Sequence, residues 1–228
     1  MRRILFLSTI YFLLSTSLFA QSVDLLWQGD GYVPPFYKGR VMWSQQSKIT
    51  LLAIPQDLGN PADLNYKWVQ NGTVLGSLSG VGKNTLTLSD TILSKSQTIR
   101  VEIVSEENEA LAQAFTTLTP VAPTLLVYEN SPLYGLLSYR DLSGTYNLKE
   151  PEVTFEVIPL FFSASDRFSS DLKYIWKTNN QEVEEKSSVI YRAPENSRGS
   201  SSVSINVNHK NKILQTANKR FTVIFGND

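Results

Sequence analysis

The chain has 228 residues, a formal net charge of +0 at pH 7, no cysteine and one histidine. This charge balance gives no electrostatic reason to expect nucleic acid or an anionic membrane surface as a partner. The lack of cysteine excludes disulfides and a lipoprotein anchor on cysteine, and one histidine without cysteine cannot build a zinc site. We therefore expect a chain without cofactor or metal, stabilised by its hydrophobic cores alone.

The first twenty residues are typical of a secretory signal. Arg2 and Arg3 precede an apolar run, and Ala20 supplies a small residue at the expected cleavage point. Cleavage there leaves 19 basic and 21 acidic residues, a formal charge of −2. The alternative is an uncleaved anchor, because residues 4–20 are at the short limit for a membrane span. Either form predicts export of the remainder to the periplasm, the cell surface or the medium.

Residues 31–40, with the sequence GYVPPFYKGR, bring aromatic, proline and basic residues together shortly after the signal. Two interpretations are open. Proline lacks the N–H that a central strand donates, so the segment suits an edge strand or a crossing between sheets. An exposed patch of this composition is instead typical of a recognition site. The candidate recognition residues are Tyr32, Phe36, Tyr37, Lys38 and Arg40.

A carbohydrate-binding module is the rival hypothesis for this part of the chain. It requires Trp27, Tyr32, Phe36, Tyr37 or Trp43 to stand exposed as a flat stacking platform. The edge-strand interpretation instead turns at least two of Trp27, Phe36 and Trp43 into the core, where burial stabilises them. The exposure of Phe36 should distinguish the two.

Three segments of the first half recur in the same order in the second half, at offsets of 104 or 108 residues. The matched pairs are 49–55 with 153–159, 66–68 with 174–176, and 99–103 with 203–207. The longer segments alternate apolar and polar residues with a period of two, which is typical of half-buried strands. The repeat predicts two all-β units, residues 21–119 and 120–228, joined by a short proline-containing linker at 119–124.

Trp68 and Trp176 each follow a tyrosine by two residues, on the same face of an expected strand. Together with the turn at Asn71 and Gly72, the first copy resembles the Tyr-x-Trp-x-x-Asn-Gly pattern of bacterial immunoglobulin-like and PKD-like extracellular repeats. The resemblance implies two tandem β-sandwiches in which both tryptophans are core markers between the sheets. It implies a fold and no particular ligand.

The remaining motifs favour structural roles. Residues 79–85 are rich in glycine but lack the spacing of a phosphate-binding loop, so we expect a turn. His209 is expected on an exposed hairpin turn, and the sequence has no nucleophile-elbow motif with which it could form a serine triad. The acidic groups at 106–109 and 182–185 are expected on solvated turns, with a calcium loop as the alternative. No catalytic, cofactor-binding or metal-binding residue is predicted.

The sequence as a whole predicts an exported, non-enzymatic module that binds or spaces through tandem immunoglobulin-like domains. The expected partner is an envelope or surface protein, or a glycan. Carbohydrate binding through the aromatic residues of 27–43 is the alternative function. An enzyme would require an acid–base set that the sequence does not suggest.

Overall fold

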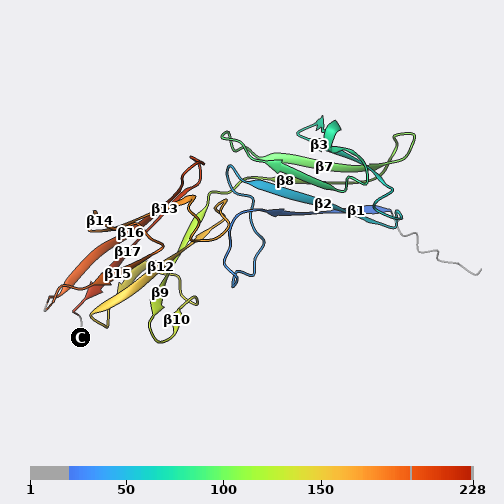
Figure 1. Cartoon of the computed structure of the whole chain (residues 1–228). Helices are drawn as coiled ribbons and strands as arrows, with labels where there is room; N and C mark the ends of the chain where they lie inside the picture. Colours follow the sequence, from blue (N-terminus) through green and yellow to red (C-terminus); the bar gives the residue numbers. More distant parts are fainter. Residues whose placement is uncertain (1–20, 196, 227–228) are drawn as a thin grey trace, which may run out of the picture.

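The computed structural model describes residues 21–195 and 197–226. The predicted signal at 1–20 lies outside these residues. Within the described chain the elements are β-strands, apart from one short 3-10 helix at Gly76–Leu78. No helix of this described part is long and apolar enough to cross a membrane. The strands form two β-sandwiches that lie end to end (Figure 1).

The first sandwich consists of two facing sheets. One has the order β1-β2-β6, with β1 at Ser22–Gly29, β2 at Lys48–Gln56 and β6 at Thr85–Ser89. The other has the order β4-β3-β7-β8, with β3 at Asn65–Gln70, β4 at Thr73–Val74, β7 at Gln97–Val104, β8 at Ala110–Leu118, and β5 at Gly80–Val81 pairing with β3. Alternate residues of both sheets, among them Ile49, Leu51 and Val101, meet in one core. The period-two pattern thus places one face of each sheet inward.

The second sandwich repeats this plan. Its first sheet has the order β10-β9-β12-β15, with β9 at Thr124–Ser131, β10 at Gly135–Leu136, β12 at Glu152–Leu160 and β15 at Ser188–Arg192. Its second sheet has the order β11-β17-β16-β13-β14, with β11 at Gly144–Asn147, β13 at Leu172–Thr178, β14 at Gln181–Glu184, β16 at Gly199–His209 and β17 at Thr216–Phe225. Phe155, Val157 and Ile205 belong to its core.

The two sandwiches share a strand register around their tryptophans. Trp68 lies opposite Val101, and Trp176 lies opposite Ile205. Both indoles are fully buried, and each Nε1–H donates to a main-chain carbonyl of a later loop, at 2.8 and 2.9 Å. A central tryptophan between two such antiparallel sheets is the arrangement of an immunoglobulin-like sandwich. The chain is therefore an all-β tandem of two immunoglobulin-like domains.

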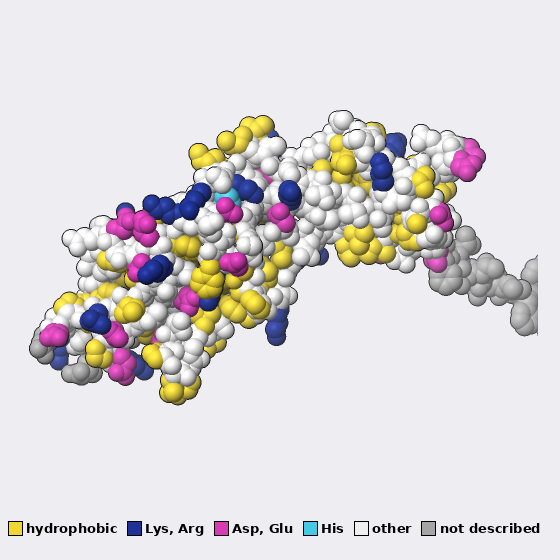
Figure 2. Space-filling view, viewed as in Figure 1, with side chains coloured by type: hydrophobic (Ala, Val, Ile, Leu, Met, Phe, Trp, Pro, Cys, Tyr) yellow, Lys and Arg dark blue, Asp and Glu magenta, His cyan; other side chains and the backbone are white. Residues whose placement is uncertain are grey.

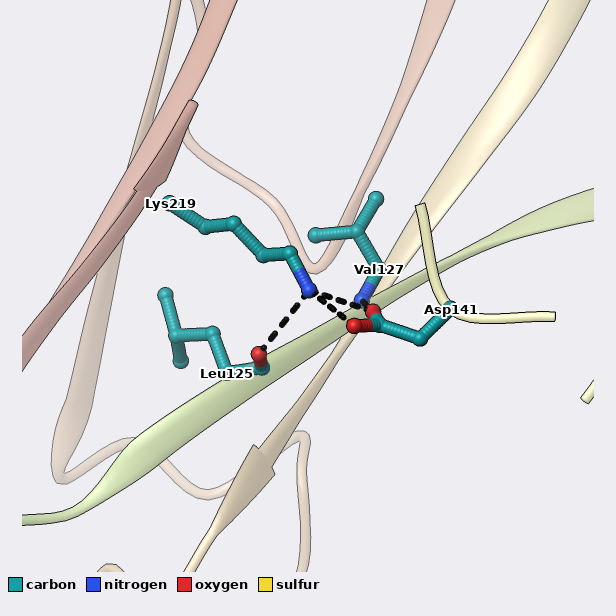
Figure 3. Close-up of polar contacts among 4 residues, drawn as sticks. All are labelled: Leu125, Val127, Asp141 and Lys219. Atoms are coloured by element: carbon teal, nitrogen blue, oxygen red, sulfur yellow. Dashed lines mark hydrogen bonds and ion pairs between the residues drawn. The ribbon is translucent and has the colours of Figure 1, made fainter. Parts of the chain in front are cut away.

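The sandwiches differ on the side where the first and last strands approach each other. In the first domain β1 and β8 lie side by side. Ala114 of β8 lies opposite Val101 of β7, the residue that also faces Trp68. Lys219 has the matching position in the second domain, and its Nζ forms an ion pair with Asp141 (Figure 3). Asp141 Oδ1 also accepts from the Val127 amide at 2.8 Å, and Lys219 Nζ lies 3.5 Å from the Leu125 carbonyl. This ion pair ties β9 to β17.

Candidate functional site

The proline-containing segment that follows β1 is a loop, so the edge-strand part of that interpretation is wrong, whereas Trp43 and Trp27 do turn toward the core. β1 ends at Gly29, and residues 30–43 form a loop that we call the first arm. The chain returns to its own domain at Ser44, which makes a parallel bridge to Val121 in the linker. Between these points the arm leaves its own sheets and finds apolar and main-chain hydrogen-bonding partners in the second domain.

The first arm lies on the outer face of the sheet that contains β9 and β12. Four apolar residues of that face are buried and form a separate cluster: Tyr128, Ile158, Leu160 and Phe161. Arm residues packed against this cluster are Tyr32, Val33, Tyr37, Val41 and Met42. The ring of Tyr37 meets Phe161 edge-on at 5.8 Å, and Phe36 meets Tyr128 edge-on at 6.1 Å. The arm thus creates a third hydrophobic cluster between the two domain cores.

Two main-chain hydrogen bonds fasten the arm. The Tyr32 amide donates to the Phe162 carbonyl, and the Phe161 amide donates to the Tyr32 carbonyl, both at 2.7 Å. Phe161 has a φ of +66°, a left-handed conformation that is rare for a bulky residue and persists only where its surroundings hold it. A Cβ on Gly31 would lie 2.7 Å from the Phe161 Cα. The close approach of the two backbones therefore requires glycine at position 31.

A second set of hydrogen bonds joins the domains at the hairpin that follows β16. Gln215 is fully buried, and its Nε2 donates to the Gln45 carbonyl and to Ser163 Oγ, both at 2.8 Å. The Leu214 amide donates to Gln46 Oε1 at 2.7 Å. Because a buried amide is costly without partners, Gln215 favours the docked arrangement of the two domains.

A buried acid lies beside the docked arm. The carboxylate of Glu156 binds Arg167 at 2.8 Å and accepts from Asn130 Nδ2 at 2.9 Å. Burial raises the pKa of the nearby Tyr32 phenol above its usual value, and the positive charge of Arg167 opposes that rise. The neutral phenol is therefore the form that fits this interface.

The structure divides the aromatic members of the predicted recognition patch. Tyr32 and Tyr37 pack against the second domain. Phe36 keeps 41% of its surface exposed, with its ring contacting Tyr128. Phe36 is thus neither buried in the first core nor exposed as a pair with Tyr37, so neither interpretation from the sequence describes it fully.

A flat aromatic platform is not formed by residues 27–43. Trp43 is 3% exposed in the first core. Trp27 packs against the same core, and the Arg40 guanidinium lies over its ring at 4.4 Å. Lys38 is exposed at the tip of the arm. Trp27, Tyr32, Tyr37 and Trp43 turn toward the core or toward the second domain, and of the five candidate rings Phe36 alone is exposed, so the flat platform that the carbohydrate-binding hypothesis requires is absent from these described residues.

His209 is buried at the end of β16, which corrects the expectation of an exposed turn. Its Nδ1 accepts from the Asn211 amide at 3.1 Å, and its Nε2 lies 3.1 Å from the Ser163 carbonyl. These contacts place the ring proton on Nε2. Both nitrogens hold the hairpin beside the domain interface.

The acidic groups have separate positions. Residues 106–109 lie at the turn between β7 and β8, as expected, whereas Glu182 and Glu184 lie in β14 rather than in a turn. Residues 21–195 and 197–226 contain no group of three side chains of the His, Cys, Asp or Glu type that could hold a metal ion.

The interface was not predicted, although the sequence contains one signal for it. Residues 157–162 read Val-Ile-Pro-Leu-Phe-Phe, apolar on both faces of the strand. The matching residues 53–58 read Ala-Ile-Pro-Gln-Asp-Leu and include polar positions. A strand that is apolar on both faces is typically covered on both. That contrast between the two copies predicts a covering element on the second domain.

No protein-family model matches the sequence, and no curated protein matches it. Among solved structures, three N-terminal domains of the bacteriophage RB49 Highly Immunogenic Outer Capsid protein match 90% of this chain at 13% identity with a TM-score of 0.43, and this chain covers 59% of that structure. The Clostridium thermocellum CbhA fibronectin(III)-like modules match 88% of this chain and 94% of their own length at 10% identity with a TM-score of 0.28. Immunoglobulin domains 1–5 of Sidekick-1 match 89% of this chain and 41% of their own length at 15% identity with a TM-score of 0.30.

Proposed function

We propose that this protein is an exported, non-enzymatic spacer of the cell surface or envelope that holds two immunoglobulin-like domains at a fixed relative position. The observation that carries the proposal is the first arm, whose backbone and rings bind the outer face of the second domain. Relative motion is the default for tandem domains unless their interface is hydrophobic and extensive. Here the arm, the linker and Gln215 all oppose such motion.

The linker supports rigidity as well. The Val121 amide donates to the Trp43 carbonyl at 2.8 Å, and the Gln45 amide donates to the Val121 carbonyl at 2.9 Å. Pro120 and Pro123 are buried on either side of these bonds. We place the domain boundary within residues 119–124, between 21–119 and 120–228, and expect little bending there.

The aromatic arm favours protein recognition over glycan stacking. Its rings already bind a protein surface, namely the outer face of β9 and β12. We therefore propose that partners of this module are envelope or surface proteins, recognised by sandwich faces and loops held at fixed spacing. The non-enzymatic role is supported by His209, both of whose ring nitrogens are engaged in holding a hairpin.

Export is tested by recovering the protein from a bacterial host and determining where it is and how it begins. The proposal predicts protein outside the cytoplasmic membrane, with Gln21 as its first residue or with the signal retained as an anchor. Protein found in the cytoplasm with Met1 in place would contradict the proposal. A chain in which Arg2, Arg3 and the apolar run are deleted serves as the retained control.

A further inference from the structure

The second domain has an arm at the same place as the first arm. Residues 132–143, which we call the second arm, lead from β9 to β11, and β11 pairs in parallel with the last strand. Within the arm, β10 pairs back on β9 and Leu142 is buried in the core of its own domain, so the arm projects through the residues between these points. In this arm Leu133, Tyr134 and Tyr139 are 77%, 76% and 82% exposed. Figure 2 shows hydrophobic side chains projecting from the lower end of the second domain, where β9 and β10 turn. Leu133 and Tyr134 are neighbours in the chain and both largely exposed, and adjoining exposed apolar groups are typical of an interaction site.

The first domain has the face that such an arm would cover. Leu26 of β1 lies opposite Leu52 of β2, just as Tyr128 of β9 lies opposite Glu156 of β12. Tyr128 is buried beneath the first arm, whereas Leu26 and Leu52 are 50% and 37% exposed. Figure 2 shows hydrophobic side chains on the lower surface of the first domain, below β1 and β2. Leu26 and Leu52 also border a surface hollow of about 620 Å³, which gives a protruding side chain room to insert.

The turn that follows β2 in the first domain has the same backbone conformation as the turn after β12 that binds the first arm. Asp57 follows β2 as Phe161 follows β12, and their φ angles are +56° and +66°. In the second domain this turn supplies an amide and the next carbonyl to Tyr32. Among the described residues, no hydrogen bond uses the Asp57 amide or the Leu58 carbonyl. The left-handed turn is thus present in both domains, but it binds an arm in only one.

The charges of the two surfaces are complementary. Exposed Asp24 and Asp57 lie at the end of the β1–β2 face where β1 begins, and Arg40 lines the hollow toward the other end. The second arm carries exposed Arg140, which would meet the acidic end. The neighbouring Asp141 is paired with Lys219 and does not oppose this attraction. Opposite charges at the rim of an apolar contact favour one orientation of docking.

We propose that the second arm of one molecule docks on the β1–β2 face of a second copy through the exposed side chains of Leu133 and Tyr134. The two surfaces differ, so each copy that binds presents a further arm, and the copies extend head to tail. The start of β1 and the C-terminus lie at opposite ends of the molecule, as such an assembly requires (Figure 1). The inference rests on the proposed spacer role, because head-to-tail docking would extend the spacer formed by the two domains.

The test uses the exported chain and two surface variants. The arm variant combines Leu133→Ser with Tyr134→Ser, and the face variant combines Leu26→Thr with Leu52→Thr. All four side chains are exposed, so folding should be retained, and threonine keeps the strand preference of β1 and β2. Phe115→Ser on β8, which removes a ring that is 75% exposed and belongs to neither surface, is the matched control.

Sedimentation velocity is measured from micromolar concentrations to about 1 mM, a range that includes weak heterologous contacts. We expect the unaltered chain and the Phe115→Ser control to grow beyond the dimer as concentration rises. Each variant alone should stay monomeric. An equimolar mixture of the two should stop at the dimer, because only one functional arm and one functional face remain to meet.

Three results would overturn the inference: a monomeric unaltered chain over the whole range, assembly of either variant alone, or a mixture that stays monomeric. Assembly by the face variant alone would indicate association between identical surfaces instead. None of these results affects the spacer proposal, whose rigidity is measured within one chain at concentrations where the chain is monomeric.

Discussion

Gly31 packs so closely on Phe161 that a Cβ at position 31 would lie 2.7 Å from the Phe161 Cα and 2.8 Å from its carbonyl oxygen. Atoms do not approach a Cβ that closely, so Gly31→Ala must push the first arm away from the second domain. We expect amide exchange at Tyr32 and Phe161 to accelerate by about ten-fold or more, because local opening of the arm becomes easier. Exchange at Trp68, in the core of the first domain, should be unchanged.

Gly76→Ala is the matched control, because nothing lies within 4 Å of a Cβ at that position and its φ is not positive. Hydrogen exchange followed by NMR reports each amide separately. If the Gly31→Ala and Gly76→Ala variants exchange alike at Tyr32, the arm is not held by this backbone contact.

The two central tryptophans should each be required for stability. Trp68→Ala and Trp176→Ala remove fully buried side chains and should each lower the free energy of unfolding by about 3–5 kcal/mol. Chemical denaturation, followed by circular dichroism, measures this loss. A loss of under about 1 kcal/mol at either position would contradict its place between the sheets.

The Lys219–Asp141 pair should be coupled more strongly than an ion pair on the surface. A double-mutant cycle with Lys219→Met and Asp141→Ala should give an interaction energy of about 1–3 kcal/mol, since Lys219 is largely buried and Asp141 also binds the Val127 amide. The exposed Arg192–Glu152 pair provides the comparison, with about 0.2–1 kcal/mol expected. Equal coupling in the two cycles would show that β9 and β17 are not tied by this pair.

Burial raises the pKa of Tyr32 above its usual value, which makes the interface sensitive to alkali. A raised phenol pKa means that the docked state favours the protonated ring. The contribution of the neutral Tyr32 phenol to stability is complete below the ordinary tyrosine pKa of about 10, and it is lost as pH rises through the raised pKa of Tyr32 in the folded chain. Between about pH 9 and 12, Tyr32→Phe should therefore lose less stability than the unaltered chain. Urea denaturation at a series of pH values checks this, and parallel slopes for both proteins would contradict it.

The fold was predictable because its signals are local in the sequence. Alternation around Ile49 and Phe155 and the repeated tyrosine–tryptophan pairs identify half-buried strands and the centre of each core. The first arm was not predictable from its own sequence, because its partners at Tyr128 and Phe161 lie about a hundred residues away. A proline-rich aromatic loop and an edge strand have similar composition, and only the surface that receives them distinguishes the two.

His209 shows the same limit on a smaller scale. Its polar neighbours predict a turn, and the turn is present, but the ring is buried against Ser163, whose own position depends on Gln215. Burial of a turn residue is decided by what packs on the turn. That information is distributed over both domains and is absent from any short window of sequence.

The most direct test of the account is the distance between the two domains within one chain. The chain has no cysteine, so Gln113→Cys on β8 and Lys177→Cys on β13, both at exposed positions, accept spin labels without side reactions. Double electron–electron resonance should give a single narrow distance distribution for this pair, and Gly31→Ala should broaden it. A broad distribution before Gly31 is changed would contradict the central claim that the first arm holds the two immunoglobulin-like domains as one rigid body.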